Sequence, residues 1–211
     1  MPKVQDAIQK VINEAIPASC TIYCRNKNER WSGSGFHIGN GYIITASHVA
    51  PANFMDGGSK IDVEFDKNNV YQCTILKSSE QIDVAILKIQ GNYTNLHHVV
   101  LADSEYTQVG DVVAVIGAPE GWSDTATVGR VSNTNQSMGS SAPSPAWNNV
   151  DFVDAKILQG VSGGMCIGTD GLVIGSVIGV TGLLADYGIG QNVICPSNKI
   201  IKLLKSNAQN N

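Results

Sequence analysis

Charged residues are scarce in this chain, making up 15% of its 211 residues. The net charge at pH 7 is −4, and no run of lysines and arginines occurs. Proteins that bind nucleic acids need a concentrated basic surface to hold the phosphates. The composition therefore excludes nucleic acid as a partner.

Long apolar runs are also missing. The N-terminal stretch MPKVQDAIQKVINEAIP lacks the apolar core of a signal peptide. No segment approaches the roughly 20 apolar residues that cross a bilayer, so no membrane partner is expected. The cysteines are odd in number and lack the spacing of metal ligands, so we expect no metal and interpret them as buried free thiols in a reducing compartment. They are Cys20, Cys24, Cys73, Cys166 and Cys195. We therefore predict a cytoplasmic or intracellular protein, and a viral protein in a host cell stays an alternative.

What the chain does have is glycine, with 22 residues, and many short runs typical of β-strands. Gly, Asn, Asp or Ser stand in most of the gaps between these runs. Many short strands with hardly a helix between them indicate antiparallel barrels or sandwiches rather than βαβ units. The runs are 20–24, 34–39, 41–46, 60–65, 70–76, 84–89, 97–102, 111–117, 126–132, 150–158, 164–168, 171–180 and 191–195.

Two helices and one long loop complete the expected organisation. Residues 6–16 carry apolar side chains at helical spacing, and Pro17 ends the run. Residues 196–207, PSNKIIKLLKSN, form a capped C-terminal helix, and the polar segment 134–149 is expected to be a loop. We place an N-terminal helix at 1–17, a first group of strands at 18–105 and a second at 106–211.

A serine among glycines, in QGVSGGMC at 159–166, raises the question of catalysis. GVSGG matches the G-x-S-x-G elbow of α/β-hydrolases, but all four histidines precede Ser162, whereas that fold needs its histidine afterwards. The subtilisin order requires an aspartate ahead of the histidine, and Asp6 is a weak candidate. The remaining order is His, Asp, Ser, which is the order of chymotrypsin.

His48 and Asp83 are the candidates for the other two positions. His48 follows the β-branched strand GYIITA, and a lone histidine at a strand end is more often structural than catalytic. Asp83 heads the apolar strand VAILKI, where a carboxylate is costly unless it is paired or hydrogen-bonded. An imidazole N–H suits it, and a solvated turn aspartate is the alternative.

The flanks of these residues resemble blocks of one family. GSGFHIGNGYIITASHV, IDVAILKI, VGDVVAVIGAPEG, TATVGRVS, DAKILQGVSGG and GIGQNVICPSNKIIKLL are similar, in this order, to blocks of HtrA/Deg-type serine proteases. The resemblance covers roughly residues 20–205. It implies an all-β fold of two antiparallel six-stranded β-barrels, chymotrypsin/trypsin-like, with the two helices added. It implies the protease domain alone, without the PDZ domain common in that family.

The same resemblance implies the roles of the site residues. Ser162 would attack the scissile carbonyl, His48 would move the proton, and Asp83 would orient His48. The backbone N–H groups of Gly160 and Ser162 would form the oxyanion hole. The expected function is that of a serine endopeptidase that acts on proteins or peptides and needs no cofactor. The alternative is a catalytically silent barrel that binds peptides or joins an assembly.

Specificity and assembly are less constrained by the sequence. By the resemblance, Val177, Ile178 and Gly179 would line the primary pocket, with Lys156 near its base. The apolar wall favours small or medium aliphatic P1 side chains, whereas an inward Lys156 would favour an acidic one. Because burying an unpaired lysine is costly, we favour a Lys156 that points to solvent. The helix at 6–16 is expected either to dock on its own barrel or to mediate trimers, as N-terminal segments do in the resembling family.

Overall fold

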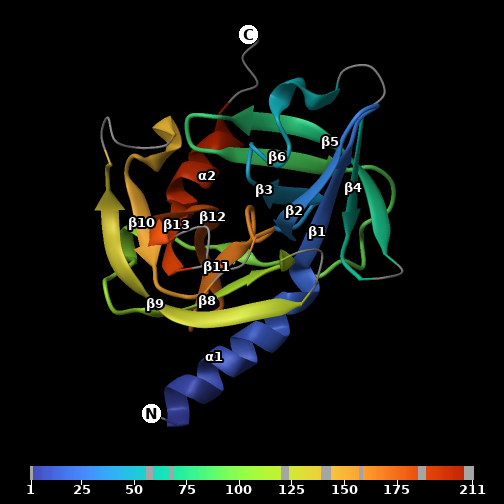
Figure 1. The fold of residues 1–211 in the computed structure, drawn as a ribbon. Coiled ribbons are helices and arrows are strands. Elements are labelled where there is room, and N and C mark those ends of the chain that lie inside the picture. Colours follow the sequence, from blue (N-terminus) through green and yellow to red (C-terminus); the bar gives the residue numbers. More distant parts are fainter. Residues whose placement is uncertain are drawn as a thin grey trace.

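A computed structural model describes residues 2–55, 59–66, 69–119, 124–138, 144–156, 159–184 and 189–206. Strands dominate it, and they form two sheets side by side (Figure 1). The all-β prediction with two barrels and two terminal helices is confirmed.

The first sheet is a closed barrel in the order β1-β2-β3-β6-β5-β4. Its strands are β1 (Ser19–Arg25), β2 (Arg30–His37), β3 (Tyr42–Thr45), β4 (Lys60–Glu64), β5 (Val70–Ser79) and β6 (Val84–Ile89). Antiparallel pairing of β1 with β4 closes the ring, which leaves no free sheet edge. Pairing of β3 with β6 sets Thr45 opposite Ala85, so the end of β3 lies beside the start of β6.

The second sheet has the order β11-β8-β9-β10-β13-β12-β7, and a further pairing of β11 with β12 closes six of its strands into a barrel. Its strands are β7 (Val100–Leu101), β8 (Val112–Gly117), β9 (Thr125–Gln136), β10 (Val150–Val153), β11 (Met165–Gly168), β12 (Leu172–Leu184) and β13 (Ile189–Pro196). The short β7 joins β12 in parallel. The segment 18–105 therefore holds the whole first barrel and also one strand of the second sheet.

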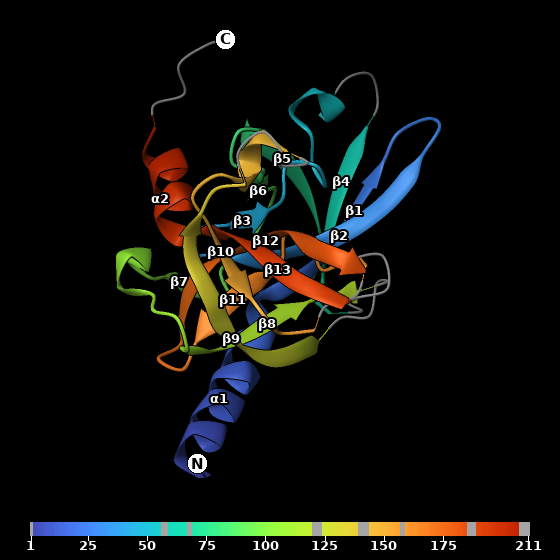
Figure 2. The same ribbon diagram turned by 60° about the vertical axis from the view of Figure 1, so that its left-hand side comes forward.

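Helix α1 (Pro2–Ala15) projects from the barrels with the N-terminus at its free end (Figures 1 and 2). Its buried side chains Ile8, Val11 and Ile12 belong to the core cluster that contains residues of both barrels. Helix α2 (Ser197–Lys205) packs against β12 and β13 near the other end of the chain. None of the described helices has the length and apolar character needed to span a bilayer.

Three local features differ from the sequence-based expectation. Helix α1 begins four residues before position 6, where the apolar spacing starts. Of the run 97–102, only Val100–Leu101 is a strand. The segment 134–149 is no continuous loop, because β9 extends to Gln136 and a 3₁₀ turn forms at Pro145–Trp147; residues 139–143 lie outside the described part.

The buried His37 holds a turn of the first barrel together as a neutral ring. Its Nδ1 lies 2.7 Å from the carbonyl oxygen of His97, and the N–H of Gly41 donates to its Nε2 at 3.1 Å. Nε2 therefore accepts and Nδ1 donates, which is the pattern of an uncharged imidazole. Burial lowers the pKa of His37, the His97 carbonyl opposes this, and the neighbouring charges of His98 and Lys88 lower it further.

This lowered pKa predicts a stability that depends on pH. Below the ordinary histidine pKa of about 6.5, the unfolded chain binds a proton at His37 that the folded chain excludes. The free energy of unfolding should therefore fall as the pH falls from 7.5 to 5, by at most about 1.4 kcal/mol per pH unit. Urea unfolding at several pH values should show this slope reduced in His37→Gln and kept in His97→Gln, whose side chain is exposed. Equal slopes in both variants would refute this account of His37.

Candidate active site

The end of β3 and the start of β6 bring His48 and Asp83 into contact. Nδ1 of His48 lies 2.7 Å from Oδ2 of Asp83. The backbone N–H of His48 donates to Oδ1 of Asp83 at 2.9 Å, and the Ser47 hydroxyl donates to the same oxygen at 2.8 Å. Asp83 has a φ of 51°, in the left-handed region that aspartate tolerates better than most residues. The Asp83 carboxylate therefore accepts hydrogen bonds from both the backbone and the ring of His48.

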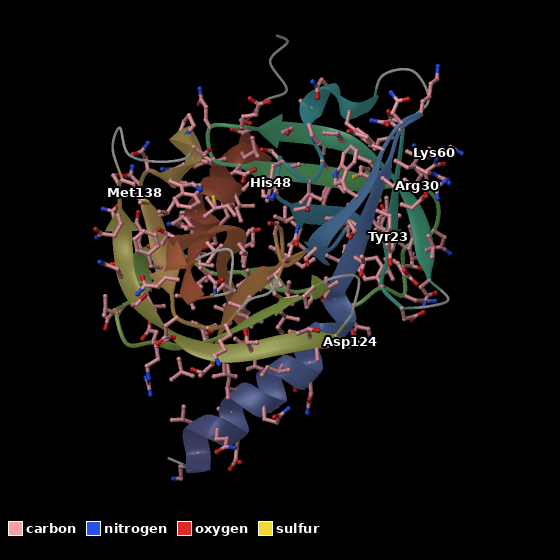
Figure 3. The ribbon with its side chains drawn as sticks, viewed as in Figure 1. Tyr23, Arg30, His48, Lys60, Asp124 and Met138 are labelled. Carbon is pink, nitrogen blue, oxygen red and sulfur yellow. The ribbon has the colours of Figure 1, made fainter. Side chains whose placement is uncertain are left out.

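The two side chains of this pair differ in exposure and charge. The His48 side chain is 49% exposed, whereas that of Asp83 is 12% exposed. Burial alone raises the pKa of Asp83, but the hydrogen bonds and charge of His48, together with the Ser47 hydroxyl, outweigh it and place this pKa below its ordinary value. Asp83 is thus ionised at neutral pH and holds Nδ1 of His48 as a donor. Figure 3 shows His48 near the middle of the molecule.

Residues 159–164, here called the glycine turn, carry Ser162 between β10 and β11. Gly160 and Gly163 have φ values of 98° and 86°, which side chains other than glycine rarely adopt. The N–H of Gly163 donates to the Val177 carbonyl at 2.7 Å, and that of Gly164 donates to the Val161 carbonyl at 2.8 Å. The turn is thus fixed by its own backbone and by β12.

The glycine turn packs against the segment that leads to His48. A Cβ atom on Gly163 would lie 2.2 Å from the Ser34 carbonyl oxygen, 2.4 Å from Thr45 Oγ1 and 2.8 Å from the backbone nitrogen of Ala46. Only glycine therefore permits this approach, and Thr45 and Ala46 directly precede Ser47 and His48. The structure brings His48 and Asp83 together and sets the Ser162 turn beside them; among the described residues, the Ser162 hydroxyl makes no hydrogen bond.

Four backbone N–H groups of the glycine turn make no hydrogen bond within the described part of the chain. They belong to Gln159, Gly160, Val161 and Ser162, whereas Gly163 and Gly164 donate to carbonyls. Unpaired donors beside a serine hydroxyl can stabilise negative charge on an oxygen. The groups of Gly160 and Ser162 are those predicted for the oxyanion hole, and this role stays a prediction.

Comparison with known proteins decides the family. A family model described as a trypsin-like peptidase domain matches residues 33–175, a range that includes His48, Asp83 and Ser162. The chain belongs to the trypsin-like peptidase family. The resemblance to HtrA/Deg-type proteases is confirmed by the relatives and solved structures that match it.

Two curated relatives of this peptidase are endoproteases of Escherichia coli (strain K12). The periplasmic pH-dependent serine endoprotease DegQ is 32% identical over 170 residues, which are 79% of this chain and 34% of the relative. The periplasmic serine endoprotease DegP is 33% identical over 174 residues, which are 81% of this chain and 34% of the relative. The chain thus spans about a third of the length of these relatives.

Solved structures agree with this assignment. The HtrA-type protease AlgW with a tripeptide has a TM-score of 0.81 and 25% identity, covering 94% of this chain and 62% of that one. The structure of Deg5 has a TM-score of 0.76, and the match covers 92% of the Deg5 chain. Because the two sequences are only 24% identical, this match supports the fold alone.

The predicted intracellular location is wrong, because the matching relatives are named as periplasmic and point to the periplasm. The prediction took free cysteines as a sign of a reducing compartment. All five are indeed free and buried. Burial is the main cause that raises the pKa of Cys24, Cys73 and Cys195 to about 12. Since the thiolate is the reactive form, buried thiols of this peptidase resist oxidation in either compartment.

The residues predicted for the primary pocket of the peptidase occupy different environments. Val177 and Ile178 are 1% and 3% exposed, so their side chains belong to the core. Gly179 lies against the Trp147 ring, because a Cβ on Gly179 would be 2.7 Å from Trp147 Cζ2. Lys156 is exposed and lines an outer hollow with Arg130 and others. Their roles in the pocket stay predictions. The contact of Trp147 with Gly179 is not indicated by the sequence, where Trp147 lies in the polar segment 134–149.

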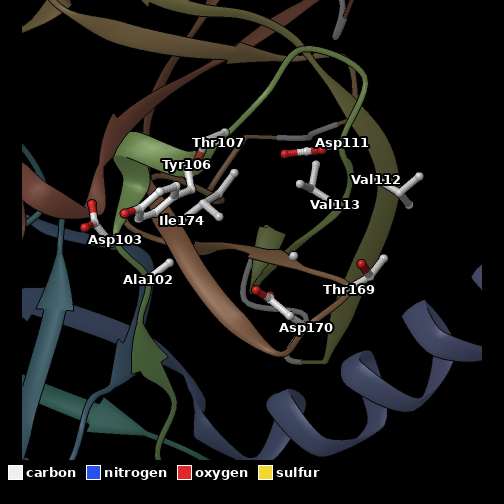
Figure 4. A pocket seen from close by; sticks show the side chains of 11 residues that line it. Ala102, Asp103, Tyr106, Thr107, Asp111, Val112, Val113, Thr169, Asp170 and Ile174 are labelled. Carbon is white, nitrogen blue, oxygen red and sulfur yellow. The ribbon is translucent and has the colours of Figure 1, made fainter.

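A separate hollow of about 240 Å³ is lined by Asp103, Asp111 and Asp170 among others (Figure 4). Each carboxylate accepts a backbone N–H within a turn: Asp103 from Glu105, Asp111 from Gln108, and Asp170 from Leu172. These aspartates serve the local structure of the peptidase. No group of three or more His, Cys, Asp or Glu side chains suited to a metal occurs in the described residues.

Proposed function

We propose that this protein is a serine endopeptidase that hydrolyses peptide bonds through Ser162, His48 and Asp83. The observation that carries the proposal is the contact of His48 Nδ1 with Asp83 Oδ2 at 2.7 Å, at the strand end where the Ser162 turn packs. Proteins or peptides are the substrate class, which the names of the relatives and the tripeptide in the similar structure support.

The pairing of His48 sets the direction of proton transfer. Because Nδ1 donates to Asp83, Nε2 is the nitrogen left to accept the proton of the Ser162 hydroxyl. Ser162 Oγ then bonds to the substrate carbonyl carbon, and the carbonyl oxygen gains negative charge facing the N–H groups of Gly160 and Ser162. His48 gives the proton to the leaving amine as the C–N bond breaks, which leaves the acyl-enzyme. Water then attacks the acyl carbon while His48 takes its proton, and that proton passes to Ser162 Oγ as the ester bond breaks.

The primary pocket is proposed to be lined by the backbone of Val177, Ile178 and Gly179, since the first two side chains are buried. Small or medium aliphatic P1 residues are proposed, because this segment brings no charged side chain to the pocket. The exposure of Lys156 supports the orientation to solvent rather than the inward one that would select acidic P1 residues. Profiling of cleavage sites on a peptide library distinguishes the two.

Assembly through α1 also stays a proposal. The burial of Ile8, Val11 and Ile12 supports docking of the helix on its own barrel. Val4, near its free end, is 47% exposed, which supports contact with a second copy.

A fluorophosphonate probe tests the proposed function directly. Attack by Ser162 Oγ on phosphorus forms an O–P bond and breaks the P–F bond, while the serine proton passes to His48 and fluoride leaves. We expect a single labelled site, identified at Ser162 by peptide mass mapping, and no label in Ser162→Ala. Ser34, which is fully buried, serves as an internal control that stays unlabelled.

The silent-barrel alternative predicts the opposite result. A folded wild-type protein that neither takes the label nor cleaves an unfolded protein such as casein would contradict the proposed endopeptidase. Peptide binding without cleavage would then favour the binding or assembly function.

A further inference from the structure

We propose that Ser34 of the first barrel is a positioning residue that holds the glycine turn in its catalytic shape. The inference rests on the proposed function and adds a residue that acts through the oxyanion donors without touching substrate. Ser34 lies in β2 and is fully buried. The motif G-S-G at 33–35 lies in the block GSGFHIGNGYIITASHV that carries the family resemblance.

The hydroxyl, the backbone N–H and the carbonyl of Ser34 all make hydrogen bonds. The N–H of Ala118 donates to Ser34 Oγ at 2.8 Å, so the hydroxyl hydrogen is left to donate to the Gly160 carbonyl at 2.7 Å. The backbone N–H of Ser34 donates to the Ser162 carbonyl at 2.8 Å. The Thr45 hydroxyl in turn donates to the Ser34 carbonyl at 2.7 Å. One residue thus joins the glycine turn to the end of β8 and to the strand that precedes His48.

These bonds bear on the direction of the free N–H group of Ser162. Ser34 fixes the peptide groups that follow Gly160 and Ser162, and the Val161 carbonyl is turned inward to accept from Gly164. In a planar trans peptide, the N–H and C=O point in opposite directions. The N–H of Ser162 therefore points away from the hydrogen bond that the Val161 carbonyl accepts from Gly164. The Val161–Ser162 peptide, which carries this N–H, lies between the two peptide groups that Ser34 holds. Without the Ser34 hydroxyl, the Gly160–Val161 peptide loses the partner that opposes its rotation, and the adjoining Ser162 N–H loses its fixed direction.

The backbone segments around Ser34 pack closely against its hydroxyl and its carbonyl oxygen. A Cβ on Gly117 would lie 2.8 Å from Ser34 Oγ, and a Cβ on Gly163 would lie 2.2 Å from the Ser34 carbonyl oxygen. Glycines on both sides thus allow β2 to approach β8 and the glycine turn closely. This close fit holds Ser34 Oγ and the Ser34 carbonyl oxygen against the end of β8 and the glycine turn.

Ser34→Ala is the test variant, and Ser197→Ala is the matched control. Ser197 is also fully buried, and its hydroxyl donates to a backbone carbonyl, that of Ala102, at 2.8 Å. Loss of one oxyanion donor typically costs about 10²–10³ in kcat. Because Ser34 acts through such donors, we expect kcat to fall about 10- to 100-fold in Ser34→Ala with KM within twofold. The affinity for a peptidyl boronate, whose tetrahedral adduct occupies the same hole, should fall by the same factor.

Ser34→Cys keeps a weak donor of similar size and should recover part of the lost kcat. If Ser34→Ala fails to fold, Ser34→Cys decides: a joint loss of kcat and boronate affinity supports the proposal. Values within twofold of wild type in Ser34→Ala, or in Ser34→Cys if only that variant folds, would overturn it. Ser197→Ala should lose stability while keeping both values.

Amide hydrogen exchange separates this inference from the proposed function, because it needs no activity. The donors of Gly163 and Gly164 should exchange at least about tenfold faster in Ser34→Ala than in wild type or Ser197→Ala. Unchanged exchange there would overturn the role of Ser34 even in an active enzyme. A wild type that neither cleaves nor labels would instead refute the endopeptidase and the catalytic use of the turn.

Discussion

Replacing Ser162 by alanine is expected to lower kcat for peptide hydrolysis by about 10⁵- to 10⁶-fold, the scale typical of loss of a serine nucleophile. The variant lacks the oxygen that forms the acyl-enzyme. The nearby Ser47 and Ser34 hydroxyls are committed to Asp83 and Gly160. A residual rate above that of water would come from the oxyanion donors and substrate binding.

Stability provides the control for this result. The Ser162 hydroxyl makes no hydrogen bond within the described residues, so its removal should leave the free energy of unfolding within about 0.5 kcal/mol of wild type. Ser132→Ala, which removes a buried hydroxyl that also lacks a partner there, should keep full kcat. Both variants are compared by cleavage of a chemically unfolded casein and by urea unfolding. Undiminished cleavage by Ser162→Ala would assign the activity to another residue.

The contact of His48 with Asp83 illustrates what the sequence could predict. Asp83 stands alone at the head of the apolar β6, so its carboxylate needed a partner, and the family order supplied His48. The antiparallel pairing of β3 with β6 then places the two strand ends side by side. The strand pattern and the cost of burying a charge indicated that Asp83 needed a partner, but the choice of His48 depended on the family resemblance.

The support of the glycine turn could not be predicted in the same way. Ser34 and Gly160 are 126 residues apart, and their hydrogen bond depends on how the two barrels pack. Likewise, Trp147 meets Gly179 only once β12 and the 3₁₀ turn at Pro145–Trp147 are placed. Hydrophobic periodicity reports which face of a strand is buried but not which residue it meets across an interface.

The compartment was mispredicted for a different physical reason. Cysteine number and spacing indicate whether disulfides form, but they do not report how reactive a thiol is. Cys166, for example, is fully buried, and burial holds its pKa well above the usual range. Such a thiol is chemically inert whether the surroundings are reducing or oxidising.

Asp83→Asn is expected to lower kcat by about 10⁴-fold while leaving the fold intact. Asparagine tolerates the φ of 51° at this position as aspartate does. Its carbonyl oxygen can still accept from the His48 backbone N–H and from Ser47, which now bond to Oδ1. Its amide group, however, would donate to His48 Nδ1, which moves the ring proton to Nε2. Nε2, which is proposed to accept the Ser162 proton, would then be a donor and unable to take it.

The measurement pairs Asp83→Asn with Asp62→Asn, whose carboxylate faces Arg25 at 3.4 Å on the first barrel. Asp62→Asn should retain kcat. The free energy of unfolding of Asp83→Asn should be lower than that of wild type by no more than about 2 kcal/mol, because the side-chain shape and the neutral hydrogen bonds are kept. Retention of kcat within tenfold by Asp83→Asn would identify Asp83 as a turn residue that caps the segment 46–48. A loss of kcat at nearly unchanged stability can arise only if the charge and the ring tautomer it selects are used in the reaction, which is the step that separates a structural ion pair from a catalytic one.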